Sequence, residues 1–130
     1  MEIPGNLKYA KTHEWVRVAG QLAYVGITDY AQEALGDIVY VELPSVDERY
    51  DRGEEIGTVE SVKAASAIYT PVTGTVAEVN AELEASPELI NQKPYQAFIF
   101  AVRLTDLSQL QDLLDAEAYA RHVEQEKGSH

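Results

Sequence analysis

The sequence predicts one mainly β domain, an antiparallel barrel or sandwich with a short early helix and C-terminal helices. Its 130 residues are enough for a single core of ordinary size. About seven short segments alternate apolar and polar residues, as half-buried strands do. Helical spacing of apolar residues dominates only after Asp106, so we expect the sheets to be complete before that point.

The first part of the chain predicts a hairpin followed by a helix. Residues 14–18 and 22–27 both alternate, and a short turn at 19–21 joins them. A helix is expected to begin at Thr28-Asp29, with Asp29 and Gln32 at capping-box spacing and Gly36 placed to end it.

The middle of the chain predicts three strands separated by turns. Residues 37–43 alternate up to Pro44, and the charged segment 45–53 is typical of turns. Strands at 56–61 and 67–72 follow, with about five residues between them, and Lys63 lies in that gap.

The last part predicts two more strands and two helices. Strands are expected at 75–80 and 97–104, with a helical turn starting at Ser86-Pro87-Glu88. After Asp106, Ser108 and Gln111 have capping-box spacing before a leucine face, and Ala116–Gln125 predicts a polar helix with an apolar pair at Tyr119 and Val123. The leucine face comprises Leu107, Leu110, Leu113 and Leu114.

Charge and composition exclude several classes of protein. Ten Lys and Arg against 22 Asp and Glu give a net charge of −12, so we expect no nucleic-acid partner and no membrane partner. The chain has no cysteine, which excludes disulfides and thiol nucleophiles. The longest apolar run, 97–102, is too short to span a bilayer, and the first residues do not resemble a signal peptide.

No catalytic or metal-binding motif is apparent, so we expect no catalytic residues and no metal. The chain lacks Gly-x-Ser-x-Gly, His-Glu-x-x-His and the glycine-rich phosphate loops. His13 and Glu14 are adjacent on a predicted strand, where neighbouring side chains point to opposite faces. They are therefore not expected to act as an acid–base pair.

Lys63 is the remaining candidate. A lysine at a hairpin tip often keeps the hairpin from aggregating. It also suits a covalently attached acyl cofactor, because the flexible stem projects the amine and the small Ala64 and Ala65 leave room for a modifying enzyme. The residues alone leave both interpretations open.

Several motifs in a fixed order resemble the glycine cleavage system H protein family. The resemblance covers about residues 7–119 and rests on Tyr9–Trp15, Val25–Gln32, Leu35–Asp37, Val41–Pro44, Glu60–Ala64, Pro71–Gly74, Glu78–Asn80, Pro87–Asn91 and Pro94-Tyr95.

The resemblance implies a fold, a cofactor and a site. The fold is a barrel-sandwich hybrid of the lipoyl/biotinyl-domain type, with residues 1–127 as one lipoyl-carrier domain. Residues 128–130 are expected to be a tag remnant or a disordered tail. Lys63 matches the lysine that carries lipoate, and Glu60, Ser61, Val62 and Ala64 form the hairpin that the lipoylating enzyme recognises. Thr12 and Glu14 match a cleft that shelters the loaded arm; Glu14 is otherwise an ordinary solvent-facing strand residue.

The resemblance also implies a carrier protein rather than an enzyme. Its aminomethyl cargo passes from glycine decarboxylase, a pyridoxal-phosphate enzyme, to aminomethyltransferase, and dihydrolipoyl dehydrogenase reoxidises the dithiol. A lipoate ligase or lipoyl transferase attaches the cofactor. We expect a monomer in a bacterial cytoplasm rather than in a mitochondrial matrix. The alternative is an H-like lipoyl-relay protein that donates lipoate to 2-oxoacid dehydrogenase subunits.

Three positions depart from the family pattern. Ala67 stands where the family usually has Asp, which removes one polar partner from the cleft. Asp47 replaces a usual Gly in the loop after Pro44. The segment Tyr95–Phe98 is one residue shorter than usual and lacks a Gly and a Trp.

Overall fold

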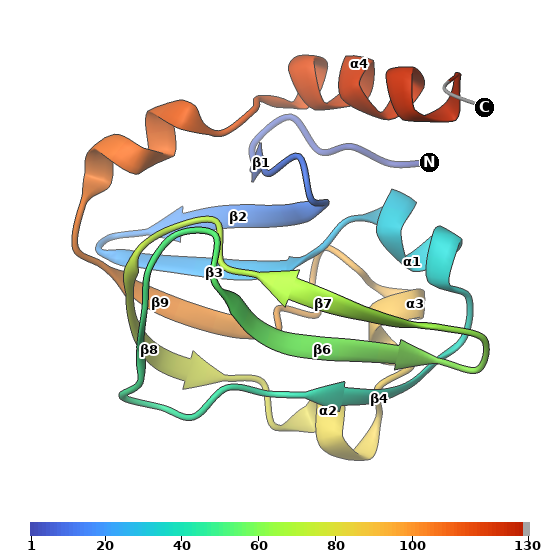
Figure 1. Ribbon diagram of the computed structural model, residues 1–130, viewed down its shortest axis with the longest axis horizontal. Helices are drawn as coiled ribbons and strands as arrows, with labels where there is room; N and C mark the ends of the chain where they lie inside the picture. Colours follow the sequence, from blue (N-terminus) through green and yellow to red (C-terminus); the bar gives the residue numbers. More distant parts are fainter. Residues whose placement is uncertain (129–130) are drawn as a thin grey trace.

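Two antiparallel sheets form the protein, and the computed structural model describes them within residues 1–128 (Figure 1). The larger sheet has the strand order β1-β2-β3-β9-β8-β5, and the smaller has the order β4-β6-β7. The strands are β1 (Lys8–Tyr9), β2 (Glu14–Ala19), β3 (Leu22–Ile27), β4 (Ile38–Glu42), β5 (Arg49–Tyr50), β6 (Glu55–Ser61), β7 (Ala65–Tyr69), β8 (Gly74–Val79) and β9 (Phe100–Leu104). The mainly β prediction is confirmed.

The predicted hairpin and helix are present. Strands β2 and β3 pair from Glu14 with Ile27 to Ala19 with Leu22. Helix α1 (Asp29–Leu35) ends at Gly36, whose φ of 83° is a conformation that glycine adopts without strain. The expected start at Thr28-Asp29 is confirmed, since the Thr28 hydroxyl caps the helix by accepting the hydrogen bond from the Ala31 amide, but the capping box of Asp29 and Gln32 is not formed. Asp29 instead accepts a hydrogen bond from the Gln32 side chain.

The small sheet contains the lysine hairpin. Only three residues separate β6 and β7, so the predicted gap of about five is too long. Strand β7 also ends at Tyr69 rather than at residue 72. The reason is local: the Thr70 hydroxyl donates to the Val72 carbonyl and bends the chain before Pro71.

The structure also contains three short elements, β5, α2 and α3. Strand β5 lies within the segment predicted as turns and pairs with β8. Helices α2 (Glu82–Ala85) and α3 (Leu89–Gln92) lie between β8 and β9; α3 follows the predicted start at Ser86-Pro87-Glu88, whereas α2 was not predicted. Strand β9 begins three residues later than expected, at Phe100.

The C-terminal part differs from the prediction in its first helix. Residues Leu107–Asp112 form a 3₁₀ helix, η1, capped by Asp106 rather than by Ser108. The predicted leucine face is only partly buried, since Leu107 is 60% exposed. Helix α4 (Ala116–Lys127) buries Tyr119 and Val123 as predicted and lies across β1 (Figure 1). Gly128 follows α4, and the rest of the expected tail, 129–130, lies outside the described residues.

Two clusters of buried side chains hold these layers together. The larger joins the inner faces of the two sheets and includes Val25, Val59 and Phe100. The smaller lies between the large sheet and α4, and comprises Leu7, Tyr9, Trp15, Tyr119 and Val123. No helix in the described part of the chain has the length and apolar character needed to cross a membrane.

Candidate functional site

Lys63 lies at the tip of the β6–β7 hairpin, and Ser61 fixes the shape of this tip. The Ser61 hydroxyl oxygen accepts hydrogen bonds from the amides of Lys63 and Ala64, at 3.3 and 3.0 Å. The Ser61 amide donates to the Ala64 carbonyl at 2.7 Å. These contacts close a tight turn that leaves the Lys63 side chain exposed.

The hairpin tip rests on the segment that follows α1. The Val62 amide donates to the Asp37 carbonyl at 3.1 Å, and the Lys63 Cε atom lies 3.6 Å from where a β-carbon on Gly36 would be. Val62 is 72% exposed, and Glu60 and Ala64 are also exposed. None of the ion pairs found within residues 1–128 involves Lys63, so its amine is accessible.

A cleft of about 290 Å³ lies beside the hairpin. Thr12 and Glu14 line it from the β1–β2 segment, and Ser66 and Ala67 line it from β7. Ala67 lies in β7, four residues after Lys63. The remaining lining residues are His13, Ile27, Tyr30, Ala31, Ala34, Leu35, Val59, Ile68 and Glu126. The two residues predicted for a sheltering cleft therefore share one cavity, close to the lysine hairpin.

Glu14 is buried, with 1% of its surface exposed, so the interpretation as a solvent-facing strand residue is wrong. Its carboxylate accepts hydrogen bonds from the Thr12 hydroxyl and from the Tyr69 amide. Both contacts favour the charged form, but burial has the larger effect and raises the pKa of Glu14 to about 7. The cleft thus contains a carboxyl group that gains or loses its proton near neutral pH.

His13 has different partners from Glu14, in agreement with the prediction that the two do not form an acid–base pair. Its Nδ1 atom lies 2.7 Å from the Tyr119 hydroxyl, and its Nε2 atom lies 3.0 Å from Oε2 of Glu126. Burial lowers the pKa of His13. His122 also contacts Glu126, at 3.0 Å, so that two imidazoles share one carboxylate.

The sequence motifs missed this cluster of His13, His122 and Glu126. Two of its members are four residues apart on α4, a spacing that places side chains on one face of a helix. His13 comes from the other end of the chain, and only the packing of α4 across β1 brings it to the other two.

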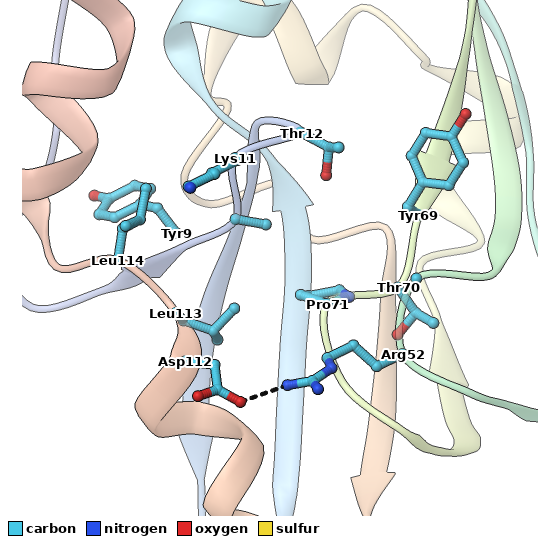
Figure 2. Close-up of a pocket in the computed structure, with 12 residues that line it drawn as sticks. Tyr9, Lys11, Thr12, Arg52, Tyr69, Thr70, Pro71, Asp112, Leu113 and Leu114 are labelled. Atoms are coloured by element: carbon cyan, nitrogen blue, oxygen red, sulfur yellow. Dashed lines mark hydrogen bonds and ion pairs between the residues drawn. The ribbon is translucent and has the colours of Figure 1, made fainter.

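A second cavity, of about 400 Å³, is lined in part by residues 10–12 (Figure 2). It is lined mainly by apolar side chains, including Tyr9, Pro71 and Leu113, and an ion pair between Arg52 and Asp112 crosses its edge. Thr12 lines both cavities, but neither Lys63 nor Glu14 reaches this one. Of these two cavities, only the smaller cleft is lined by Glu14 and by the hairpin residues Ser66 and Ala67.

The three departures from the family pattern lie in different settings. Ala67 lines the cleft, where it offers no polar group. Asp47 keeps a φ of 76°, a left-handed conformation that favours glycine but that Asp tolerates better than most residues. Phe98 packs edge-on against Tyr24, with ring centroids 5.1 Å apart.

Comparisons with known proteins agree on one family. The family model described as Glycine cleavage H-protein matches residues 7–126. The glycine cleavage system H protein of Brevibacillus brevis is 53% identical over 126 residues, which is 96% of this chain and 100% of that protein. The corresponding protein of Syntrophomonas wolfei is 50% identical over 128 residues, 98% of each chain.

A solved structure supports the same assignment. The crystal structure of a glycine cleavage system H protein from Mycobacterium marinum superposes with a TM-score of 0.86 at 37% identity, covering 94% of this chain and 99% of that one. With an exposed hairpin lysine, an adjoining cleft and a family match over nearly its whole length, this chain belongs to the glycine cleavage H-protein family.

Proposed function

We propose that Lys63 is the residue of this chain that carries lipoate, bound through an amide to its Nζ atom. Members of the family carry lipoate covalently on a lysine and serve as carrier subunits of the glycine cleavage system rather than as enzymes. The observation that supports Lys63 is its position on a three-residue tip, exposed and without an ion pair in the described chain.

The hairpin suits attachment of a long acyl group. Bound lipoate supplies a disulfide that is reduced to a dithiol and can hold a one-carbon unit, chemistry that a chain without cysteine cannot perform itself. Ser61 keeps the tip in one conformation through its hydrogen bonds to the amides of Lys63 and Ala64. Glu60, Val62 and Ala64 are exposed around the lysine, where a lipoate ligase or lipoyl transferase would contact them.

The cleft beside the hairpin is the proposed shelter for the loaded side chain. Its apolar wall includes Leu35 and Val59, while Thr12 and Glu14 provide a polar end. A protonated amine entering the cleft would stabilise the charged form of Glu14, because a charge-assisted hydrogen bond is stronger than a neutral one. Glu14 would then bind the amine without help from a second carboxylate, because Ala67 stands where the family usually has Asp.

Three enzymes are the proposed docking partners of the carrier. Glycine decarboxylase would load the aminomethyl group, aminomethyltransferase would remove it, and dihydrolipoyl dehydrogenase would reoxidise the carrier. Tethering to Lys63 raises the effective concentration of the reactive group at each partner without tight docking. The net charge of −12 favours rapid association with basic surfaces and salt-sensitive release.

Attachment is tested by incubating the purified chain with lipoate, ATP and a lipoate ligase and then measuring its intact mass. We expect the mass of one lipoyl amide, located by peptide mapping on Lys63. Lys63→Arg should remain unmodified, whereas Lys93→Arg, which changes another exposed lysine, should be modified like the wild type. A lipoyl group on another lysine, or none at all, would contradict the assignment.

The role in glycine cleavage is tested separately by reconstitution. The lipoylated chain should support glycine-dependent release of carbon dioxide with purified glycine decarboxylase, and Lys63→Arg should abolish it. A lipoylated chain that is inactive here but donates lipoate to 2-oxoacid dehydrogenase subunits would instead establish the lipoyl-relay function.

A further inference from the structure

We propose that His13, His122 and Glu126 form a binding site for one divalent transition-metal ion, with Zn²⁺ as the best-suited ion. One ligand atom from each of the three side chains lies within 4.8 Å of the other two. Nε2 of His13 and Nε2 of His122 each lie 3.0 Å from a carboxylate oxygen of Glu126. Zn²⁺ bonds to nitrogen and oxygen ligands are about 2 Å long, so small side-chain movements allow one ion to reach all three atoms. Imidazole and carboxylate groups together suit zinc and the neighbouring transition metals.

The backbone holds the three donors on one side of α4. His122 and Glu126 occupy successive turns of the helix, and the buried side chains of Tyr119 and Val123 fix the helix against the large sheet. His13 has a φ of 77°, a left-handed conformation that most residues avoid. With the backbone in this conformation, the His13 ring lies against the Glu126 carboxylate.

Two of the three proposed ligands, His13 and Glu126, have a supporting partner. The Tyr119 hydroxyl lies 2.7 Å from Nδ1 of His13, which leaves Nε2 directed at the cluster. The Tyr30 hydroxyl donates to Oε2 of Glu126 at 3.4 Å. Metal-binding histidines in general use their second ring nitrogen for a hydrogen bond of this kind, which fixes the orientation of the ring.

His122 would bind the ion through Nε2 as a neutral imidazole. Its Nε2 atom lies 3.0 Å from the Lys11 carbonyl and 3.0 Å from Oε1 of Glu126, both hydrogen-bond acceptors, so this nitrogen carries the proton in the metal-free protein. When Zn²⁺ binds, the Nε2 proton leaves to solvent while Nδ1 takes one up, so the ring stays neutral and the Nε2 lone pair coordinates the ion. No oxidant or other reactant is required.

The position of the cluster allows an ion to enter and leaves room for a further ligand. The side chains of His13, His122 and Glu126 are 17%, 21% and 39% exposed. Two imidazoles and one carboxylate make the three-ligand set of open zinc sites, in which water takes the fourth position. His13 and Glu126 also line the cleft beside the lysine hairpin, so the open position would face that cleft.

Titration of the metal-free, unlipoylated chain with Zn²⁺ tests the proposal. Calorimetry should show saturable binding of about one ion per chain, and Co²⁺ should give the visible absorption of a four-coordinate site. His122→Asn and Glu126→Gln should each weaken Zn²⁺ binding at least about tenfold. Far-UV circular dichroism checks that both variants are folded.

Two control variants distinguish Zn²⁺ binding at this site from non-specific attraction of Zn²⁺ to an acidic chain. Glu124→Gln removes the same charge from an exposed position on α4, and His130→Ala removes the third histidine of the sequence. Both should keep the wild-type affinity. The proposal would be overturned if the wild type shows no saturable binding, or if the control variants lose as much affinity as His122→Asn. Attachment of lipoate to Lys63 is measured independently, so failure of one proposal is distinguishable from failure of the other.

Discussion

Glu14 combines almost complete burial with hydrogen bonds that favour its charged form. Burial has the larger effect and raises the pKa of Glu14 from 4.5 to about 7. Between these two pH values, the folded protein holds a proton on Glu14 that the unfolded chain has released. Its contribution to stability is fully present below pH 4.5 and is lost as the pH rises through 7. The pKa difference corresponds to about 3 kcal/mol of unfolding free energy.

Glu14→Gln should remove this pH dependence. The amide keeps the size of the side chain and can donate to the Thr12 hydroxyl, but it does not ionise. We expect the variant to gain stability relative to the wild type between about pH 5 and pH 8, as measured by urea unfolding across that range. Glu60→Gln, at an exposed position, is the matched control. Parallel pH profiles for Glu14→Gln and the wild type would rule out the raised pKa.

Glu14→Ala should shorten the lifetime of the aminomethyl-loaded carrier. The variant removes the carboxylate that would bind the amine and admits water to the polar end of the cleft. Release of formaldehyde and ammonia from the isolated loaded carrier measures the lifetime, and Glu60→Ala provides a control at an exposed glutamate. Equal release rates in Glu14→Ala and the wild type would exclude a sheltering role for Glu14.

The exposure of a residue can be predicted from the sequence where it depends on local chain geometry. Lys63 is exposed because a tight turn between two alternating segments must project its side chain. The sequence does not indicate the cluster of His122 and Glu126, because its third member, His13, is 109 residues from His122 and reaches it only through tertiary packing. The burial of Glu14 was missed for the same reason, since β7 supplies the amide that covers it.

At the level of elements, the backbones of β4 and β6 leave no room for a side chain at Gly57. A β-carbon there would lie 2.5 Å from the Glu42 carbonyl oxygen, an atom that cannot move aside without displacing β4. Gly57→Ala should therefore destabilise the protein by about 2 kcal/mol, measured by denaturant unfolding. Gly5→Ala, where no atom lies within 4 Å of the added carbon, should change stability by less than about 0.5 kcal/mol. Equal stability of the two variants would contradict this packing.

Elements that are long enough to show a periodic pattern of apolar residues can be predicted from the sequence, whereas the shortest elements cannot. The alternation in β2 and β3 and the spacing of Tyr119 and Val123 on α4 are long enough to identify each element. Strand β5 has two residues and exists because Arg49 and Tyr50 pair with β8. Helix α2 has four residues, of which only Leu83 is buried, so it carries little periodic signal.

For the whole molecule, the excess of acidic residues should govern how quickly the carrier meets its partners. The rate at which dihydrolipoyl dehydrogenase reoxidises the lipoylated chain should fall as salt rises from about 0.05 to 0.5 M, because salt screens attraction between exposed charges. Free lipoamide, which lacks the charged chain, is the control substrate and should depend less on salt. The same salt dependence for both substrates would exclude steering by the protein's charge.

The position of β9 in the larger sheet restricts when that sheet can form during synthesis. Strand β9 pairs with β3 on one side and with β8 on the other, although it is the last strand in the sequence. The pairs β2–β3 and β5–β8 therefore remain unconnected until the ribosome has released Phe100–Leu104. The β6–β7 hairpin that bears Lys63 pairs only with β4, which precedes it in the sequence, so its strand pairing does not depend on β9.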